Sequence, residues 1–257
     1  MKIGCCAYSF RDDLLNKRMS LESFVELSAD MGCDVVELTS YYFPSTEIEY
    51  LHHLKKHAYQ NGVHISGTAV GSDFTSVDLI QRRKNVEATL AWIDHSVELG
   101  AATLRVFAGP IREGCSEEEA FCWAKECLEE CVQYAGQRGI LLALENHWGL
   151  TETAEKTIRL MKSVGNEWIG LNLDYGNFAS NPYEQYAECA PYTVCAHAKS
   201  HIHLQGQSVK IDYDRVRAIM EQCKYRGAVS IEYEETQNPY QAVPAFVKEL
   251  RRDLCSL

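Results

Sequence analysis

Short apolar runs alternate with longer amphipathic segments along the whole 257-residue chain. The runs are rich in β-branched and other apolar residues and predict strands, whereas the segments between them have the periodicity of helices. The eight predicted strands cover residues 2–8, 34–38, 64–69, 103–108, 140–145, 168–174, 193–199 and 228–234. Strict alternation of strand and helix over this length predicts a (β/α)8 TIM barrel. A doubly wound sheet alternates similarly, but the Gly-rich phosphate loop expected after its first strand is missing.

Helix ends are marked by capping residues. Ser116 and Glu119 form a capping box before a predicted helix over residues 118–137, and Ser20 and Thr151 are predicted N-caps of two others. Glycines expected at helix C-termini are Gly32, Gly100 and Gly165. Because no linker or low-complexity tract interrupts the pattern, we expect a single domain over residues 1–257.

Composition limits the function classes. A net charge of −11 argues against nucleic acid or an anionic membrane as a partner, since both are reached through basic patches. The apolar run near the N-terminus stops at Arg11, too early for a secretory signal or a membrane span, so we expect a cytoplasmic protein. The eleven cysteines lack zinc or C-x-x-C spacing and are interpreted as small buried hydrophobes.

Side-chain alternation places polar groups on one face of the later strands. Successive strand residues point to opposite faces, so Glu145 lies on the face opposite Leu142 and Leu144. The same parity brings Asp174, His197 and Glu232 to the inward face, each at or near the C-terminal end of its strand. Barrel enzymes keep their chemistry at this end.

Three carboxylates at one barrel mouth would repel one another, and a divalent cation resolves that repulsion. Glu145, Asp174, Glu232 and the imidazole of His197 are ligands that suit Mn²⁺, Mg²⁺ or Co²⁺, and Zn²⁺ remains possible. We expect one divalent ion per chain, with Mn²⁺ preferred.

The segments "CAYSFR", "ALENHWG", "LNLDYGNF", "AHAKS" and "SIEYE" together resemble the xylose isomerase-like sugar isomerase/epimerase superfamily. The resemblance spans essentially the whole chain. It implies that Glu145, Asp174, His197 and Glu232 bind the catalytic metal and, from the ketose 3-epimerase branch, that the two glutamates move the proton. Two positions depart from that branch. Asn177 stands where a histidine is typical, and His201 and His203 lie near the place of an arginine.

Further side chains are candidates for the reaction or for substrate binding. Lys199, two residues after His197, is expected on the same strand face, where it can stabilise a developing oxyanion. The candidate substrate-binding residues are Tyr8, Glu37, Arg105, His147 and Trp148. For Glu37 and Arg105, a structural ion pair is an equal alternative.

The sequence thus favours a metal-dependent isomerase or epimerase that removes a proton next to a carbonyl of a small carbohydrate and passes through an enediolate. The loops after the last two strands have little glycine or positive charge, which favours an unphosphorylated substrate. A metal-dependent lyase or dehydratase is the main alternative. A Schiff-base aldolase using Lys199 and a non-catalytic sugar-binding barrel are also kept, and homo-oligomerisation is left open.

Overall fold

The computed structural model describes residues 1–255, and eight of its strands close into a parallel barrel. Their order around the barrel is β1-β10-β7-β6-β5-β4-β3-β2, so strands adjacent in the chain are adjacent in the barrel. The barrel strands are β1 (Lys2–Cys6), β2 (Val35–Thr39), β3 (His64–Ala69), β4 (Thr103–Val106), β5 (Leu141–Glu145), β6 (Ile169–Asp174), β7 (Thr193–Ala198) and β10 (Ala228–Ile231). The predicted TIM barrel is confirmed.

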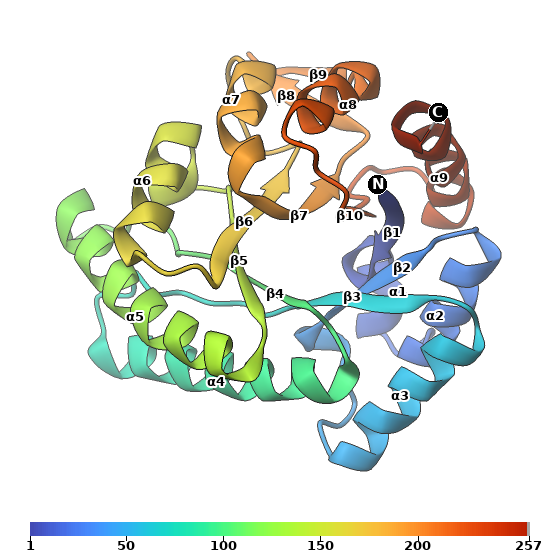
Figure 1. Cartoon of the computed structure of the whole chain (residues 1–257), viewed down its shortest axis with the longest axis horizontal. Helices are drawn as coiled ribbons and strands as arrows, with labels where there is room; N and C mark the ends of the chain where they lie inside the picture. Colours follow the sequence, from blue (N-terminus) through green and yellow to red (C-terminus); the bar gives the residue numbers. More distant parts are fainter. Residues whose placement is uncertain (256–257) are drawn as a thin grey trace.

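Helices surround the barrel, as Figure 1 shows. The long ones are α2 (Leu21–Asp30), α3 (Ile48–Gln60), α4 (Leu79–Leu99), α5 (Glu117–Arg138), α6 (Ala154–Val164), α7 (Pro182–Cys189), α8 (Tyr213–Gln222) and α9 (Pro239–Cys255). Shorter pieces are α1 (Arg11–Leu15), η1 (Ala7–Phe10), η2 (Ser40–Tyr42), η3 (Gly149–Thr151) and η4 (Ala190–Tyr192). Within residues 1–255, no helix is both long and apolar enough to cross a membrane.

Most predicted helix ends are confirmed. Ser116 and Glu119 form the capping box of α5, and the Ser20 hydroxyl accepts a hydrogen bond from the amide of Ser23 at the start of α2. The predicted cap of α6 was wrong by two residues. Thr153 caps this helix, because Thr151 is held in η3, where its hydroxyl accepts the amide of His147.

Most strands end within one residue of the predicted position, but β1 and β4 end two residues early and β10 ends three residues early. β1 stops at Cys6, so that Tyr8 lies in the turn of η1, and β10 stops at Ile231, one residue before Glu232. A two-stranded hairpin, β8 (His201–Leu204) and β9 (Gln207–Lys210), also follows β7 and was not predicted.

The polar residues of interest lie in register inside the barrel. In β5 and β6, Glu145 pairs with Asn172, and Asp174 pairs with His197 of β7. An irregularity between Leu171 and Asn172 shifts the register of β6 and β7 by one residue. The pairing therefore carries the ends of β5, β6 and β7 to one mouth of the barrel.

Candidate metal and catalytic site

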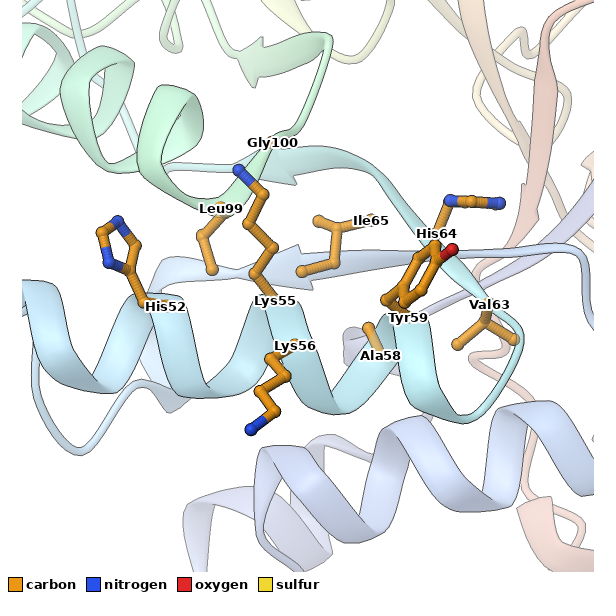
Figure 2. Close-up of a pocket in the computed structure, with 10 residues that line it drawn as sticks. All are labelled: His52, Lys55, Lys56, Ala58, Tyr59, Val63, His64, Ile65, Leu99 and Gly100. Atoms are coloured by element: carbon orange, nitrogen blue, oxygen red, sulfur yellow. The ribbon is translucent and has the colours of Figure 1, made fainter.

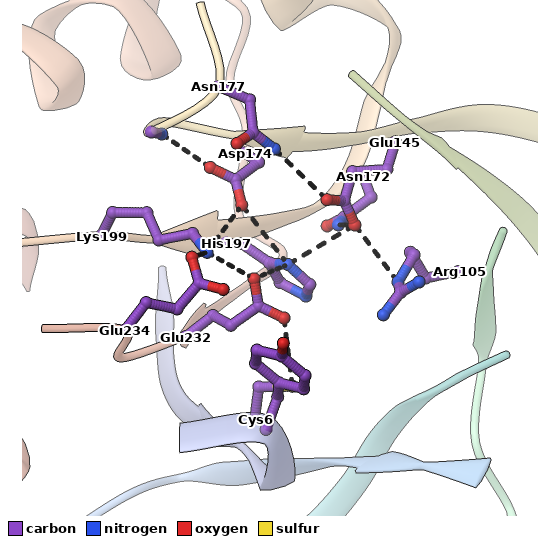
Figure 3. A network of polar contacts seen from close by, with 12 residues as sticks. Cys6, Arg105, Glu145, Asn172, Asp174, Asn177, His197, Lys199, Glu232 and Glu234 are labelled. Atoms are coloured by element: carbon purple, nitrogen blue, oxygen red, sulfur yellow. Dashed lines mark hydrogen bonds and ion pairs between the residues drawn. The ribbon is translucent and has the colours of Figure 1, made fainter. Parts of the chain in front are cut away.

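Four buried side chains from four adjacent barrel strands converge at the C-terminal mouth (Figure 3). Glu145 and Asp174 end β5 and β6, His197 lies in β7, and Glu232 directly follows β10. One potential ligand atom from each lies within 4.8 Å of the others. The structure thus brings together the four residues that the sequence proposed as metal ligands.

The spacing of these atoms suits a single ion. His197 Nδ1 lies 3.7 Å from Glu145 Oε2, 3.8 Å from Asp174 Oδ2 and 3.5 Å from Glu232 Oε2. Two atoms bonded to one ion at about 2.1 Å are separated by about 3.0 Å at a right angle and about 4.2 Å on opposite sides. The three separations fall within that range.

Two buried polar atoms without hydrogen-bond partners also indicate that a cation can bind between these residues. Among residues 1–255, His197 Nδ1 and Asp174 Oδ2 are buried and have no hydrogen-bond partner, a costly arrangement that coordination would relieve. The donor set of carboxylate oxygens and one imidazole nitrogen suits Mn²⁺, Mg²⁺, Co²⁺ or Zn²⁺. The residues present therefore fit the group that the sequence implied.

The proton affinities of the cluster reflect its crowded negative charge. Burial raises the pKa of Glu145 to about 7, although Arg105 and His197 act to lower it. Burial likewise raises the pKa of Asp174 to about 6, against the effect of Lys199. Burial alone would lower the pKa of His197, but nearby carboxylates outweigh it and raise that pKa well above its usual value. Bound positive charge, whether from protons or a metal, is favoured here.

Glu145 is held in place by three neighbours. Arg105 Nε forms an ion pair with Glu145 Oε2 at 3.2 Å, and the Asn172 amide donates to the same oxygen at 3.0 Å. The Asn177 amide lies 3.4 Å from Glu145 Oε1 and donates to the carbonyl of Asn146 at 2.9 Å. Arg105 is buried in this ion pair, with its guanidinium 4.0 Å from the Phe107 ring, so its predicted substrate contact stays a prediction.

Lys199 lies beside two of the candidate ligands. Its Nζ is 2.6 Å from Glu232 Oε2 and 3.6 Å from Asp174 Oδ2, and it also pairs with Glu234 at the rim. Burial acts to lower the pKa of Lys199, but these carboxylates raise it above its ordinary value. Lys199 is therefore an ammonium ion at neutral pH. A protonated amine is not a nucleophile, which argues against a Schiff base at this residue.

Aromatic residues line the mouth beside the cluster. After β5, the ring centroids of His147 and Trp148 lie 3.5 Å apart, and Phe107 lies 5.0 Å from Trp148. Burial lowers the pKa of His147 to about 4, so its ring is neutral. Tyr8, from η1, has the Arg11 guanidinium 5.0 Å from its ring. Substrate binding by His147, Trp148 and Tyr8 stays a prediction.

A polar cavity of about 180 Å³ reaches the cluster at Glu232. It is lined by Gly176, Asn177, Lys199, Ser200, His201, His203, Glu232, Glu234 and Glu235. Two of these, His201 and His203, come from the hairpin strand β8, which connects that unpredicted element with the site. A small molecule in this cavity can contact Lys199 and Glu232.

A larger hollow of about 350 Å³ lies between α3 and the start of β3 (Figure 2). His64 begins β3 there, and the nearby Lys55 and Lys56 are exposed. The hollow is at the N-terminal end of its strand, whereas barrel enzymes keep their chemistry at the C-terminal end. We assign no function to it.

Comparison with known proteins identifies the family. Residues 25–250 match the family model described as "Xylose isomerase-like TIM barrel", and this chain belongs to that family. A search of curated proteins finds no significant match.

Solved structures of similar fold include three that cover nearly the whole chain. A D-psicose 3-epimerase, solved with D-fructose, is 14% identical with a TM-score of 0.83 and covers 100% of both chains. A D-tagatose 3-epimerase-like protein is 21% identical with a TM-score of 0.80, covering 99% of this chain and 98% of the other. The probable 3-DHS dehydratase AsbF of Bacillus anthracis is 17% identical with a TM-score of 0.79, covering 97% and 98%. At these identities the likeness shows the fold.

Proposed function

We propose that this chain is a divalent-metal-dependent isomerase or epimerase of an uncharged keto sugar or sugar-derived keto compound. The observation that carries the proposal is the convergence of two buried glutamates, Glu145 and Glu232, with Asp174 and His197, in a cluster whose Glu232 lines a polar cavity. Similar folds in a D-psicose 3-epimerase and a D-tagatose 3-epimerase-like protein support it.

The proton transfer is assigned to the two glutamates. One carboxylate removes the proton from the carbon next to the carbonyl, and the other returns a proton to the enediolate. A divalent ion held by Glu145, Asp174, His197 and Glu232 would supply positive charge that polarises the carbonyl. Lys199 can donate a hydrogen bond to a substrate oxygen from its position beside Glu232, and adds positive charge where the oxyanion develops.

The charges around the cluster favour an uncharged substrate. Four buried carboxylates, of Glu37, Glu145, Asp174 and Glu232, face two buried cationic side chains, Arg105 and Lys199. In the metal-bound state, with these carboxylates ionised and His197 neutral, two negative units remain, which one divalent ion balances. Glu234 adds a further negative charge at the rim. A phosphorylated substrate would meet no excess of positive charge here.

A metal-dependent lyase or dehydratase is the second candidate. It shares the first proton transfer but then expels a β-substituent, which requires an acid near the leaving group. Lys199, held as an ammonium ion at the cavity, is a group of that kind. The similar fold of a probable 3-DHS dehydratase also favours this candidate. Product analysis separates the two, because elimination yields an unsaturated product and isomerisation does not.

The test is solvent exchange. The Mn²⁺-loaded protein is incubated in D₂O with a panel of unphosphorylated ketoses and inososes, and deuterium uptake at carbon is followed by NMR. Glu145→Gln and Glu232→Gln keep the side-chain shape and one oxygen but remove the base. Each should retain metal while exchange falls by roughly two to four orders of magnitude.

The matched control is Glu130→Gln, the same chemical change at a surface residue of α5 that pairs with Arg83. It should exchange like the wild type. Exchange that survives in both glutamine variants of the site would contradict the proposal. Turnover without uptake that is abolished by chelation would instead indicate hydride transfer between carbons.

A further inference from the structure

We propose that Glu37 is a positioning residue that fixes the ring of His197 so that its bare Nδ1 faces the metal cluster. The sequence placed Glu37 among the substrate-binding candidates. In the structure its side chain is buried behind His197, with its two oxygens 2.9 Å and 3.1 Å from His197 Nε2. The inference rests on the metal-binding part of the proposed function, but not on the identity of the substrate.

The hydrogen bond determines which ring nitrogen carries the proton. An ionised carboxylate can only accept hydrogen bonds, so Nε2 of His197 must be the donor. When a metal is bound, the imidazole is neutral and has one N–H, at Nε2, which leaves Nδ1 unprotonated and able to donate its lone pair. Nδ1 has no hydrogen-bond partner in the part of the chain that the structure describes, and it faces Glu145, Asp174 and Glu232 at 3.5–3.8 Å.

The contacts of His197 Nε2 with Glu37 and of Nδ1 with the cluster both favour the observed orientation of the ring. A half-turn of the His197 ring would set carbon atoms against the Glu37 carboxylate and against the three oxygens of the cluster. That orientation would leave the buried Glu37 carboxylate without its hydrogen-bond donor, which would lower the stability of the folded protein. Carboxylates that accept the second N–H of a metal-binding histidine act in this way, and their loss typically weakens metal binding by about 10- to 100-fold.

Neighbouring groups complete the support for Glu37. The Cys6 thiol lies 3.5 Å from Glu37 Oε1 and 3.7 Å from the Thr39 hydroxyl, all buried within the barrel. Cys6, Glu37 and His197 are themselves close enough to hold an ion. Burial raises the pKa of the Cys6 thiol well above its usual value, however, and metals bind the thiolate. We therefore interpret this set as hydrogen-bonded support for the first site.

The first test measures Mn²⁺ affinity of the metal-free protein by calorimetry. Glu37→Gln retains an acceptor without its charge and should weaken binding by about tenfold, whereas Glu37→Ala should weaken it by up to about 100-fold. Glu130→Gln is the matched control, because it makes the same chemical change at a surface glutamate that pairs with Arg83. It should bind Mn²⁺ like the wild type. Unchanged affinity in Glu37→Gln and in a folded Glu37→Ala would overturn the proposal.

The second test identifies the ring nitrogen directly and needs no substrate. In protein labelled with ¹⁵N-histidine and loaded with Zn²⁺, the signal of His197 should show a protonated Nε2 and a metal-bound Nδ1. The Nε2 proton should exchange slowly with solvent in the wild type and faster in Glu37→Gln. A protonated Nδ1, or two ions per chain, would overturn the proposal. Inactive protein that still shows this pattern would count only against the proposed function.

Discussion

Replacing Lys199 by methionine separates metal binding from catalysis. Methionine keeps most of the aliphatic length but removes the ammonium that lies 2.6 Å from Glu232 Oε2 and 3.6 Å from Asp174 Oδ2. Two unit charges 4 Å apart interact by about 4 kcal/mol at an effective dielectric constant of about 20. Losing a positive charge this close should make the cluster bind a divalent ion more tightly.

We expect the affinity of Lys199→Met for Mn²⁺ to rise at least about tenfold, equivalent to about 1.4 kcal/mol. The metal-free variant should melt at a lower temperature, since Glu232 loses its closest cation, and Mn²⁺ should raise its Tm by more than in the wild type. Substrate deuterium exchange should nevertheless fall by roughly two orders of magnitude or more, because the donor at the oxyanion is gone.

Calorimetric titration with Mn²⁺, thermal unfolding with and without the ion, and NMR-detected exchange measure the three effects. Lys210→Met is the control, because Lys210 is an exposed lysine of β9 that pairs with Glu249. Weaker Mn²⁺ binding in Lys199→Met would refute the electrostatic reasoning and show that the lysine holds the ligands in place. Activity that depends on Lys199 but survives complete chelation would favour the Schiff-base alternative.

Four further outcomes are expected. Asp174→Ala should lose stoichiometric Mn²⁺ binding, measured by calorimetry, because it removes a buried ligand; wild-type affinity would exclude this ligand set. The raised pKa values of Asp174, about 6, and Glu145, about 7, stabilise the metal-free fold below pH 4. This stabilisation is lost as the pH rises through 6 to 7, so Mn²⁺ binding should release protons and strengthen between pH 5 and 8, as titrations in two buffers would detect. Exposed Cys122 and Cys223 should react first with a thiol reagent in native protein, and all eleven cysteines should react in denaturant; missing thiols would indicate disulfides. Gly170→Ala should lower the free energy of unfolding by about 1–3 kcal/mol, because its Cβ would lie 2.9 Å from a backbone oxygen, and an unchanged denaturation midpoint would contradict this.

Local rules were enough to predict most of the secondary structure. The apolar runs identified all eight barrel strands because a parallel sheet under helices buries both faces of each strand. The hairpin β8–β9 was missed because its turn uses Gln205 and Gly206, both with positive φ, instead of the more usual Asn-Gly pair. The cap of α6 was predicted at Thr151 instead of Thr153 because threonine at either position can cap a helix, and only the intervening η3 excludes Thr151.

Strand parity also led to the candidate site. Period-two alternation placed Glu145, Asp174 and His197 on one face, and barrel closure brings their side chains together with Glu232. Strand parity could not predict which neighbouring side chains hydrogen-bond to these four residues. Asn172 has the same parity as Asp174, but its hydrogen bond to Glu145 depends on the register between β5 and β6.

The sequence by itself determined the order of strands and helices, the inward face of each strand and the residue types gathered at one mouth, because these follow from periodicity along a single chain. Only the tertiary structure decided which atoms meet across the barrel. Glu37 in β2 and His197 in β7 are 160 residues apart, and their hydrogen bond exists because the closed sheet curves β2 toward β7 across its interior. No local pattern encodes a contact of that kind, since it depends on strand register and barrel radius together.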